Sequence, residues 1–165
     1  MKLSIMHMKR SLRSSLSIRS ILALLFVVVA GFVLAGCKFL PAKTIDAPTE
    51  GSQEWVVWKF IEGAQKTDTM DAWTAVRPLL HSSLVELRTS EDNFLNMNFA
   101  AFRRKIKLFT PDDSKPDYKL DYTNEDQPDK EHRIFVVNEM GEVPSPFRIA
   151  RDPNANNEWR IKSIP

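Results

Sequence analysis

Few residues in this 165-residue chain have both the type and the spacing that chemistry requires. His81 directly precedes Ser82 and Ser83, and an imidazole beside a hydroxyl is the pair that activates a serine nucleophile. Neither serine lies in a G-x-S-x-G segment, which forms the strand–turn–helix elbow of such nucleophiles. We therefore interpret His81 as a residue at a helix end whose ring caps carbonyl groups, and we predict no catalytic residue.

Acid–base catalysis would need a carboxylate or an imidazole inside an apolar cavity. Glu62, Asp121 and His81 are the candidates, but the pattern around them does not place any of them inward. Three aromatic side chains are candidates for the mouth of such a cavity: Trp58, Tyr118 and Tyr122. Aromatic residues at these spacings are more typical of a core, so an enzyme is the less favoured interpretation.

No metal or cofactor site is predicted. His81 and His132 are the histidines that follow the N-terminal segment, and they are scattered, whereas zinc needs several clustered ligands. His132 opens a predicted strand and is expected to be solvated. The acidic segments 112–117 and 124–131 lack the D-x-[DN]-x-[DN]-G spacing of a calcium loop. We predict solvated turns in both.

The densest basic cluster is Arg103-Arg104-Lys105 with Lys107. Cations in the last turns of a helix complement the negative end of its dipole, and this is the interpretation that we favour. Docking onto lipid phosphates is the alternative, because a domain tethered beside a membrane would meet them.

The only cysteine, Cys37, follows an uncharged apolar run over residues 21–36. A bilayer core needs about 20 apolar residues in a helix, so this run is slightly short for a span. Residues 1–36 carry five basic and no acidic residues, and the order basic, apolar, then small is typical of a secretory signal. An uncleaved signal anchor and a buried core helix remain as alternatives. Met1, Met6 and Met8 are the possible starts.

The segment Leu34-Ala35-Gly36-Cys37 resembles the lipobox of bacterial lipoproteins. The resemblance implies cleavage between Gly36 and Cys37 after export by the general secretory route, with a diacylglyceryl group on the Cys37 thiol. Two or more acyl chains anchor a protein stably, whereas one holds marginally. By the same resemblance, Lys38 in place of Asp implies an outer-membrane protein facing the periplasm; the inner membrane and the cell surface remain open.

The charge balance beyond the leader argues against a nucleic-acid partner. Residues 37–165 carry 18 basic and 21 acidic residues, a net charge of −3. Binding to phosphate backbones draws most of its affinity from clustered cations. The 129 residues of this part are enough for one domain with one core, and a single cysteine allows no internal disulfide.

Apolar periodicity predicts helices in the first half of this domain. Residues 37–51 combine the lipidated cysteine with a segment that has no helical or strand period, and we expect a flexible tether. Helices are predicted over 52–66 and 69–77, the second ended by Pro78. A third is predicted over 91–109, with Thr89 and Asp92 as a capping box. Its inward stripe contains Leu95, Phe99, Phe102, Ile106 and Phe109.

Alternation with a period of two predicts strands after residue 115. In the first strand Tyr118, Leu120 and Tyr122 should face inward, and the continuous run 133–138 is expected to be a central strand. Two further strands should present the inward residues Phe147 and Ile149, and Trp159 and Ile161. Turns at 139–142 and 154–157 make the connections short, which favours an antiparallel meander.

Helices followed by strands indicate an α+β domain over residues 52–165, with N-terminal helices packed on a curved, cone-like antiparallel sheet of about four to five strands. The helix 52–66, the segment Trp73–Leu84, the third helix and the final strand Glu158-Trp159-Arg160-Ile161 resemble the nuclear-transport-factor-2-like superfamily, and more narrowly its lumazine-binding-like lipoproteins. That fold has an early strand after its second helix, for which only Leu84–Arg88 is available.

The main functional hypothesis is a non-enzymatic lipoprotein of the bacterial cell envelope, attached to the membrane through lipid on Cys37. Its domain would bind a small apolar ligand or an envelope protein. An enzyme that uses a cone-shaped pocket, in the manner of isomerases or dehydratases of the resembled superfamily, is one alternative. A structural subunit of an envelope complex is the other.

Overall fold

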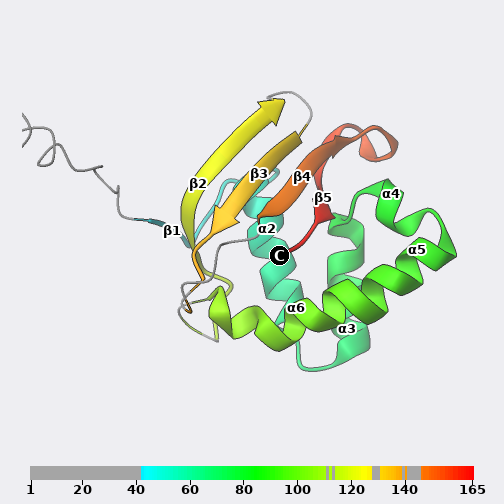
Figure 1. The fold of residues 1–165 in the computed structure, drawn as a ribbon, viewed down its shortest axis with the longest axis horizontal. Helices are drawn as coiled ribbons and strands as arrows, with labels where there is room; N and C mark the ends of the chain where they lie inside the picture. Colours follow the sequence, from blue (N-terminus) through cyan, green and yellow to red (C-terminus); the bar gives the residue numbers. More distant parts are fainter. Residues whose placement is uncertain (1–41, 111, 113, 128–130, 139, 141–145) are drawn as a thin grey trace, which may run out of the picture. The chain divides into compact units, whose positions relative to one another are not determined.

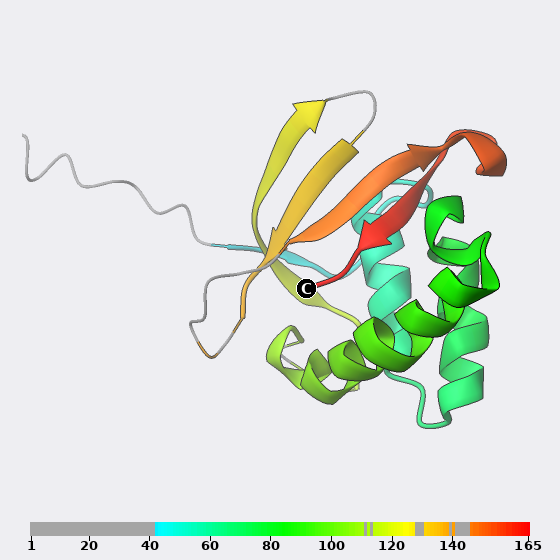
Figure 2. The ribbon, with the colours of Figure 1, turned by 45° about the vertical axis from the view of Figure 1, so that its right-hand side comes forward.

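The computed structural model describes residues 42–110, 112, 114–127, 131–138, 140 and 146–165. The leader, Cys37 and most of the predicted turn at 139–142 lie outside the described residues. Figures 1 and 2 show the strands as one layer with the helices gathered on one side of it.

The first two predicted helices are confirmed. Helix α2 (Gln53–Ala64) begins where the Ser52 hydroxyl accepts a hydrogen bond from the Trp55 amide at 3.1 Å. Helix α3 (Thr69–Val76) begins at Asp68, whose carboxylate accepts the first free amides of the helix. It ends in the short 3-10 turn η1 (Arg77–Leu79), which contains Pro78.

The third predicted helix is confirmed, but it is not a uniform α-helix. It runs through α5 (Arg88–Asn93), the π-helical turn η2 (Phe94–Phe99), α6 (Ala100–Lys105) and the 3-10 turn η3 (Ile106–Leu108). The π-helical turn brings residues five apart to one side, so Phe94 and Phe99 are both buried, while Leu95 is only partly buried.

The predicted capping box at the start of this helix is wrong. The N-cap is Leu87, which makes no side-chain capping hydrogen bond. Thr89 lies inside the first turn, and Asp92 lies 3.9 Å from Arg88 in an i, i+4 ion pair. The pattern of a hydroxyl residue three before an acidic one was present, but the helix begins two residues too early for it to cap.

The segment between α3 and α5 contains the turn η1, a single parallel bridge from Leu80 to Ile161, and one short helix. Residues 82–85 form the short helix α4 (Ser82–Val85), and α5 begins at Arg88. The segment Leu84–Arg88, offered as the early strand of the cone fold, is therefore not a strand. At this point the chain departs from the fold that the resemblance implies.

The sheet contains five antiparallel strands in the order β1 (Lys43–Ile45), β2 (Tyr118–Gln127), β3 (Glu131–Val136), β4 (Phe147–Asp152) and β5 (Glu158–Ser163). The predicted α+β class, the meander and the central position of β3 are confirmed. Among the described residues the sheet is open, with β1 and β5 at its edges.

Strand β1 lies in the stretch for which no strand was predicted. Ile45 pairs with Tyr118 of β2, and its side chain is buried against the core. Because β1 is only three residues long and contributes one buried side chain, the alternation that reveals a strand in sequence is absent.

A register shift in β2 changes the direction of one predicted inward residue. Tyr118 is buried, but the pairing with β3 shifts between Leu120 and Tyr122. Tyr122 is consequently half-exposed and stacks on Phe135, with ring centroids 4.2 Å apart. The prediction that Tyr122 faces the core is wrong.

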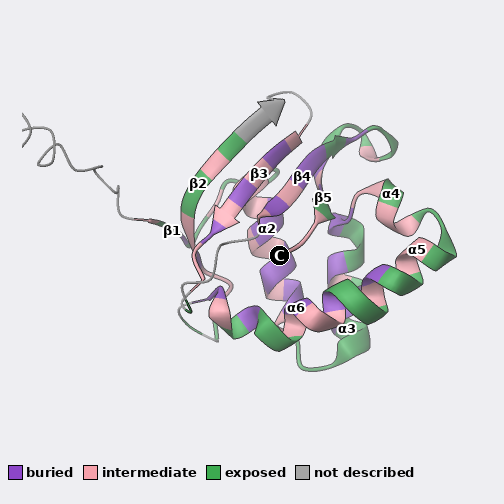
Figure 3. Ribbon diagram, in the orientation of Figure 1, coloured by how far each residue is buried: buried purple, intermediate pink, exposed green. Residues whose placement is uncertain are grey.

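Phe60 of α2 joins the helical layer to the sheet. Its ring contacts Phe99 and Phe102 of the long helix and Phe147 of β4, with centroid distances of 5.9, 5.4 and 6.0 Å. In Figure 3 the buried residues lie along α2, β3 and β4. Phe147, Ile149, Trp159 and Ile161 are buried as predicted.

Candidate functional site

The basic cluster of the long helix packs against the carboxyl end of α2. Arg103 Nε donates to the carbonyl oxygen of Ala64 at 3.1 Å, and its two terminal nitrogens reach the Lys66 and Thr67 carbonyls and the Thr69 hydroxyl. The last carbonyls of a helix have no partner within it. Arg103 therefore complements the negative end of the α2 dipole, which was not predicted. Arg103, Arg104 and Lys105 also lie in the last turn of α6, as expected.

A groove of about 400 Å³ opens beside this contact, between the α2–α3 connection and the long helix. Its basic wall carries Ala100, Arg103, Arg104 and Lys107, whose i, i+3, i+4, i+7 spacing places them on one helix face. The facing wall is the connection after α2, which contributes Lys66 and Thr67. A volume of this size is typical of a small-molecule site.

The groove combines an apolar floor with a positive rim. Leu95, Phe99 and Ile106 belong to its lining, and so do four cations, Lys66, Arg103, Arg104 and Lys107. Neither Asp nor Glu occurs among the described lining residues. Asp68 lies between the lining residues Thr67 and Thr69 in the chain, and its pKa is held below its usual range by the Asp71 and Met70 amides and by Arg103.

Sequence reasoning found the basic cluster but missed the groove. Arg103, Arg104 and Lys107 were flagged as charges at a helix end, whereas Lys66 and Thr67 lie about 40 residues away in the chain. The available signal was the position of the cations next to the apolar stripe containing Phe99 and Ile106. A stripe that borders cations can form the floor and one wall of a cavity, but the sequence does not say which segment forms the other wall.

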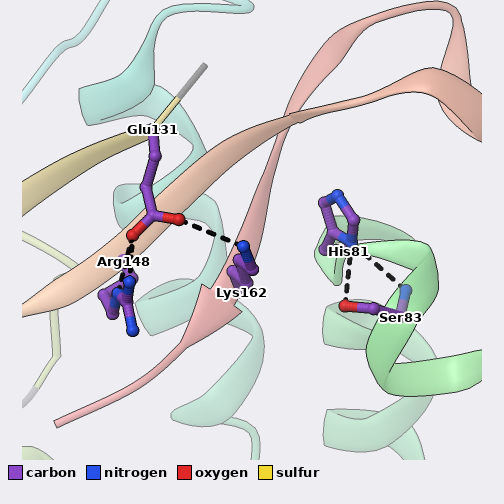
Figure 4. Close-up of polar contacts among 5 residues, drawn as sticks. All are labelled: His81, Ser83, Glu131, Arg148 and Lys162. Atoms are coloured by element: carbon purple, nitrogen blue, oxygen red, sulfur yellow. Dashed lines mark hydrogen bonds and ion pairs between the residues drawn. The ribbon is translucent and has the colours of Figure 1, made fainter. Parts of the chain in front are cut away.

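His81 caps an amide, so the prediction that it caps carbonyls is wrong. It is the N-cap of α4, where its Nδ1 accepts a hydrogen bond from the Ser83 amide at 3.2 Å and lies 3.0 Å from the Ser83 hydroxyl (Figure 4). A catalytic triad would need a carboxylate that accepts a hydrogen bond from the His81 ring. The carboxylate of Asp152 instead accepts hydrogen bonds from the Ser82 amide and hydroxyl at 2.6 and 3.0 Å. Ser83 is exposed.

The other acid–base candidates do not meet His81 or each other. Glu62 is partly exposed and pairs with Lys59 at 2.7 Å, and Asp121 is exposed. Trp58 donates from its indole to Asp117 at 3.4 Å, while the Tyr118 hydroxyl donates to the Glu54 carbonyl at 3.2 Å. Burial raises the pKa of Tyr118 far above its usual range, so its phenol stays protonated.

His132 is buried, so the prediction that it is solvated is wrong. Only 3% of it is exposed, and its ring centroid lies 4.8 Å from that of Trp159. The neighbouring Glu131 accepts hydrogen bonds from Arg148 and, at 3.1 Å, from Lys162 (Figure 4). Burial raises the pKa of Glu131, but the two cations outweigh it and leave the pKa below the usual range.

Among the described residues, no group of three or more His, Cys, Asp or Glu side chains is placed to hold a metal ion. None of the helices found there has the length and apolarity needed to cross a bilayer. Cys37 and the apolar run before it lie outside these residues.

Comparison of the chain with protein-family models, with curated proteins and with solved structures finds no match.

Proposed function

We propose that this chain is a bacterial envelope lipoprotein, held at a membrane by acyl chains on Cys37, whose domain binds a ligand without transforming it. The observation that carries the proposal is the segment Leu34-Ala35-Gly36-Cys37, which resembles a lipobox and follows a basic and then an uncharged apolar stretch. The described elements begin with β1 at Lys43. Cleavage between Gly36 and Cys37 would therefore remove the apolar leader and leave the described fold whole.

The short connection to β1 sets how far the domain stands from its anchor. Lys43 is the sixth residue after Cys37, and an extended chain spans at most about 3.6 Å per residue, so the reach is about 22 Å. β1 is held to the sheet through the buried Ile45. A lipid on Cys37 would thus hold the edge strand β1 close to the bilayer. Because Lys38, and not Asp, follows Cys37, we propose that this bilayer is the outer membrane and that the domain faces the periplasm.

The groove beside Arg103 supports the binding part of the proposal. It offers a volume of about 400 Å³ with both apolar and charged lining. The acid–base candidates Glu62, Asp121 and His81 are not part of its described lining. A relation to the nuclear-transport-factor-2-like superfamily remains part of this proposal, supported by the order of helices before a meander.

Labelling with radioactive palmitate tests the anchor. Cys37→Ser should abolish the label and leave a precursor of higher mass, because the thiol is the acceptor of the lipid. A matched control places a cysteine two residues away: Phe39→Cys in the Cys37→Ser background should stay unlabelled, since the thiol has lost its place after Leu34-Ala35-Gly36. Undiminished labelling of Cys37→Ser, or a mature chain that begins at another residue, would refute the anchor.

A further inference from the structure

The rim of the groove is positively charged, and one of its cations, Arg103, is bound to backbone carbonyl groups. The Arg103 guanidinium is used by the carbonyl end of α2, through three carbonyl oxygens. Lys66 and Arg104 line the same groove, and both are exposed. With Arg103 engaged by the negative end of the α2 dipole, these two cations add positive charge at the rim, which attracts an anion.

The floor favours a ligand that is not a bare ion. Leu95, Phe99 and Ile106 lie among the lining residues, and with Ala64 and Ala100 they give the groove an apolar base. An inorganic anion would leave this base in contact with water. A molecule with a hydrocarbon part next to its anionic group would bury it, at about 0.8 kcal/mol for each methylene removed from water.

One hydrogen bond and one strand pairing connect the groove to β1, the strand that follows Cys37. Gln65, a lining residue, donates from its side chain to the Lys115 carbonyl at 2.8 Å. Three residues after Lys115, Tyr118 pairs with Ile45 of β1. The groove is thus connected by one hydrogen bond and a few residues to the strand that follows the lipidated cysteine.

We propose that the groove binds an anionic amphiphile, with the phosphate or carboxylate held by Lys66 and Arg104 and the first part of the hydrocarbon chain lying on Leu95 and Phe99. The assignment of membrane phospholipid as a source rests on the proposed lipid anchor. A free fatty acid offers the same chemistry from a second source. The shared requirement is one negative charge joined to an apolar chain.

The test uses the mature, lipid-anchored protein in nanodiscs of phosphatidylcholine. Thr67 is exposed and lines the groove, and Cys37 is the only cysteine of the chain, so Thr67→Cys labelled with bimane reports the groove alone. Four probes are titrated: dihexanoyl phosphatidylglycerol, decanoate, inorganic phosphate and dihexanoyl phosphatidylcholine. The first two should change the fluorescence saturably, and their relative affinities distinguish a phospholipid from a fatty acid.

Two adjacent residues supply the matched variants. Arg104 lines the groove and Lys105 does not, although both are exposed cations on one helix. Arg104→Glu should weaken binding of the anionic amphiphile about tenfold or more, the low end for a lost charge-assisted hydrogen bond. Lys105→Glu, with the same change in net charge, should bind like the wild type. Arg104→Gln is a milder second variant, and circular dichroism checks that each variant folds.

Several results would overturn the assignment. They are equal weakening by Arg104→Glu and Lys105→Glu, binding of inorganic phosphate as tight as that of phosphatidylglycerol, or equal binding of the zwitterionic lipid. Palmitate labelling of the same preparations reports the anchor separately, so loss of the groove ligand and loss of the lipid on Cys37 are distinguished.

Discussion

Arg103 closes the carboxyl end of a helix from which it is 39 residues distant, with its Nε 3.1 Å from the carbonyl oxygen of Ala64. The same side chain reaches the Lys66 and Thr67 carbonyls and the Thr69 hydroxyl, so it connects α2, the start of α3 and α6. The planar guanidinium with five donors can satisfy several acceptors at once, which an ammonium group cannot.

Arg103→Ala should lower the free energy of unfolding by about 2 kcal/mol, because carbonyl groups lose charge-assisted hydrogen bonds in a partly buried place. Arg103→Lys should recover only part of this loss, since a single point charge cannot span the three carbonyls. Urea denaturation followed by circular dichroism measures both. Lys105→Ala, an exposed cation two residues on, is the control and should stay within about 0.5 kcal/mol of the wild type; a comparable loss there would contradict the role of Arg103.

Asp152 should make the stability of the domain depend on acid pH. Burial raises the pKa of Asp152, but hydrogen bonds from Ser82 and Asn154 outweigh it and hold the pKa below the usual value. A carboxyl with a depressed folded pKa stabilises fully above its unfolded pKa, about 3.9. That contribution is lost as the pH falls from there through the lower folded pKa.

Asp152→Asn should therefore destabilise the protein at pH 7 by about 1–3 kcal/mol and flatten the fall in stability below pH 4. Urea midpoints measured between pH 2 and 7 give both quantities. Asp121→Asn, at an exposed residue of β2, should reproduce the wild-type curve. An Asp152→Asn curve that runs parallel to the wild type at all pH values would show that another group controls the acid transition.

Gly63 permits the close crossing of α2 and α3. A Cβ atom at this position would lie 2.7 Å from Val76 Cγ1 and 3.2 Å from the Ala75 Cβ. Gly63→Ala would gain up to about 1 kcal/mol in helix propensity, but overpacking of a core costs about 1–3 kcal/mol. We expect net destabilisation in thermal unfolding.

Val76→Ala in the Gly63→Ala background separates the two effects. Removing the Val76 methyl groups relieves the clash, so the double variant should be more stable than the sum of the single changes by at least about 0.5 kcal/mol, the smallest coupling typical of residues in contact. Strict additivity would mean that the helices had shifted apart instead, and the predicted contact would be absent.

The helices and strands whose apolar residues recur at regular spacing could be predicted from the sequence. Phe99, Phe102, Ile106 and Phe109 recur at helical spacing and are buried. The exceptions have local irregularities: the π-helical turn buries Phe94 with Phe99, and the register shift in β2 turns Tyr122 outward. Neither irregularity has a residue signature such as the glycine or proline that marks turns.

The parts that depend on distant contacts could not be predicted. His132 is covered by Trp159, which lies two strands away in the sheet, so its own neighbours in sequence do not indicate burial. The groove likewise needs the connection after α2 to face α6, and that pairing is made by Arg103. Periodicity identifies which residues face inward, but it does not identify their partners.

Ile45 should determine where the proposed tether after Cys37 ends. It is the one buried residue of β1, and it lies opposite Tyr118. Ile45→Asp would bury an unpaired carboxylate, which costs several kcal/mol, so β1 should leave the sheet while the core around Phe60 persists. The first residue held to the fold would then be Ser52 at the start of α2, the fifteenth residue after Cys37, instead of Lys43, the sixth.

Limited proteolysis measures this release, because cleavage needs a backbone that leaves its strand. Ile45→Asp should raise the rate of cleavage within residues 42–51 about tenfold or more, the effect of about 1.4 kcal/mol of lost local stability. Thr44→Asp is the matched control: the neighbouring side chain is exposed, so the same carboxylate there should leave the rate nearly unchanged. If both variants were cleaved at the wild-type rate, β1 would be held by its backbone pairing alone, and Ile45 would not set the length of the proposed tether.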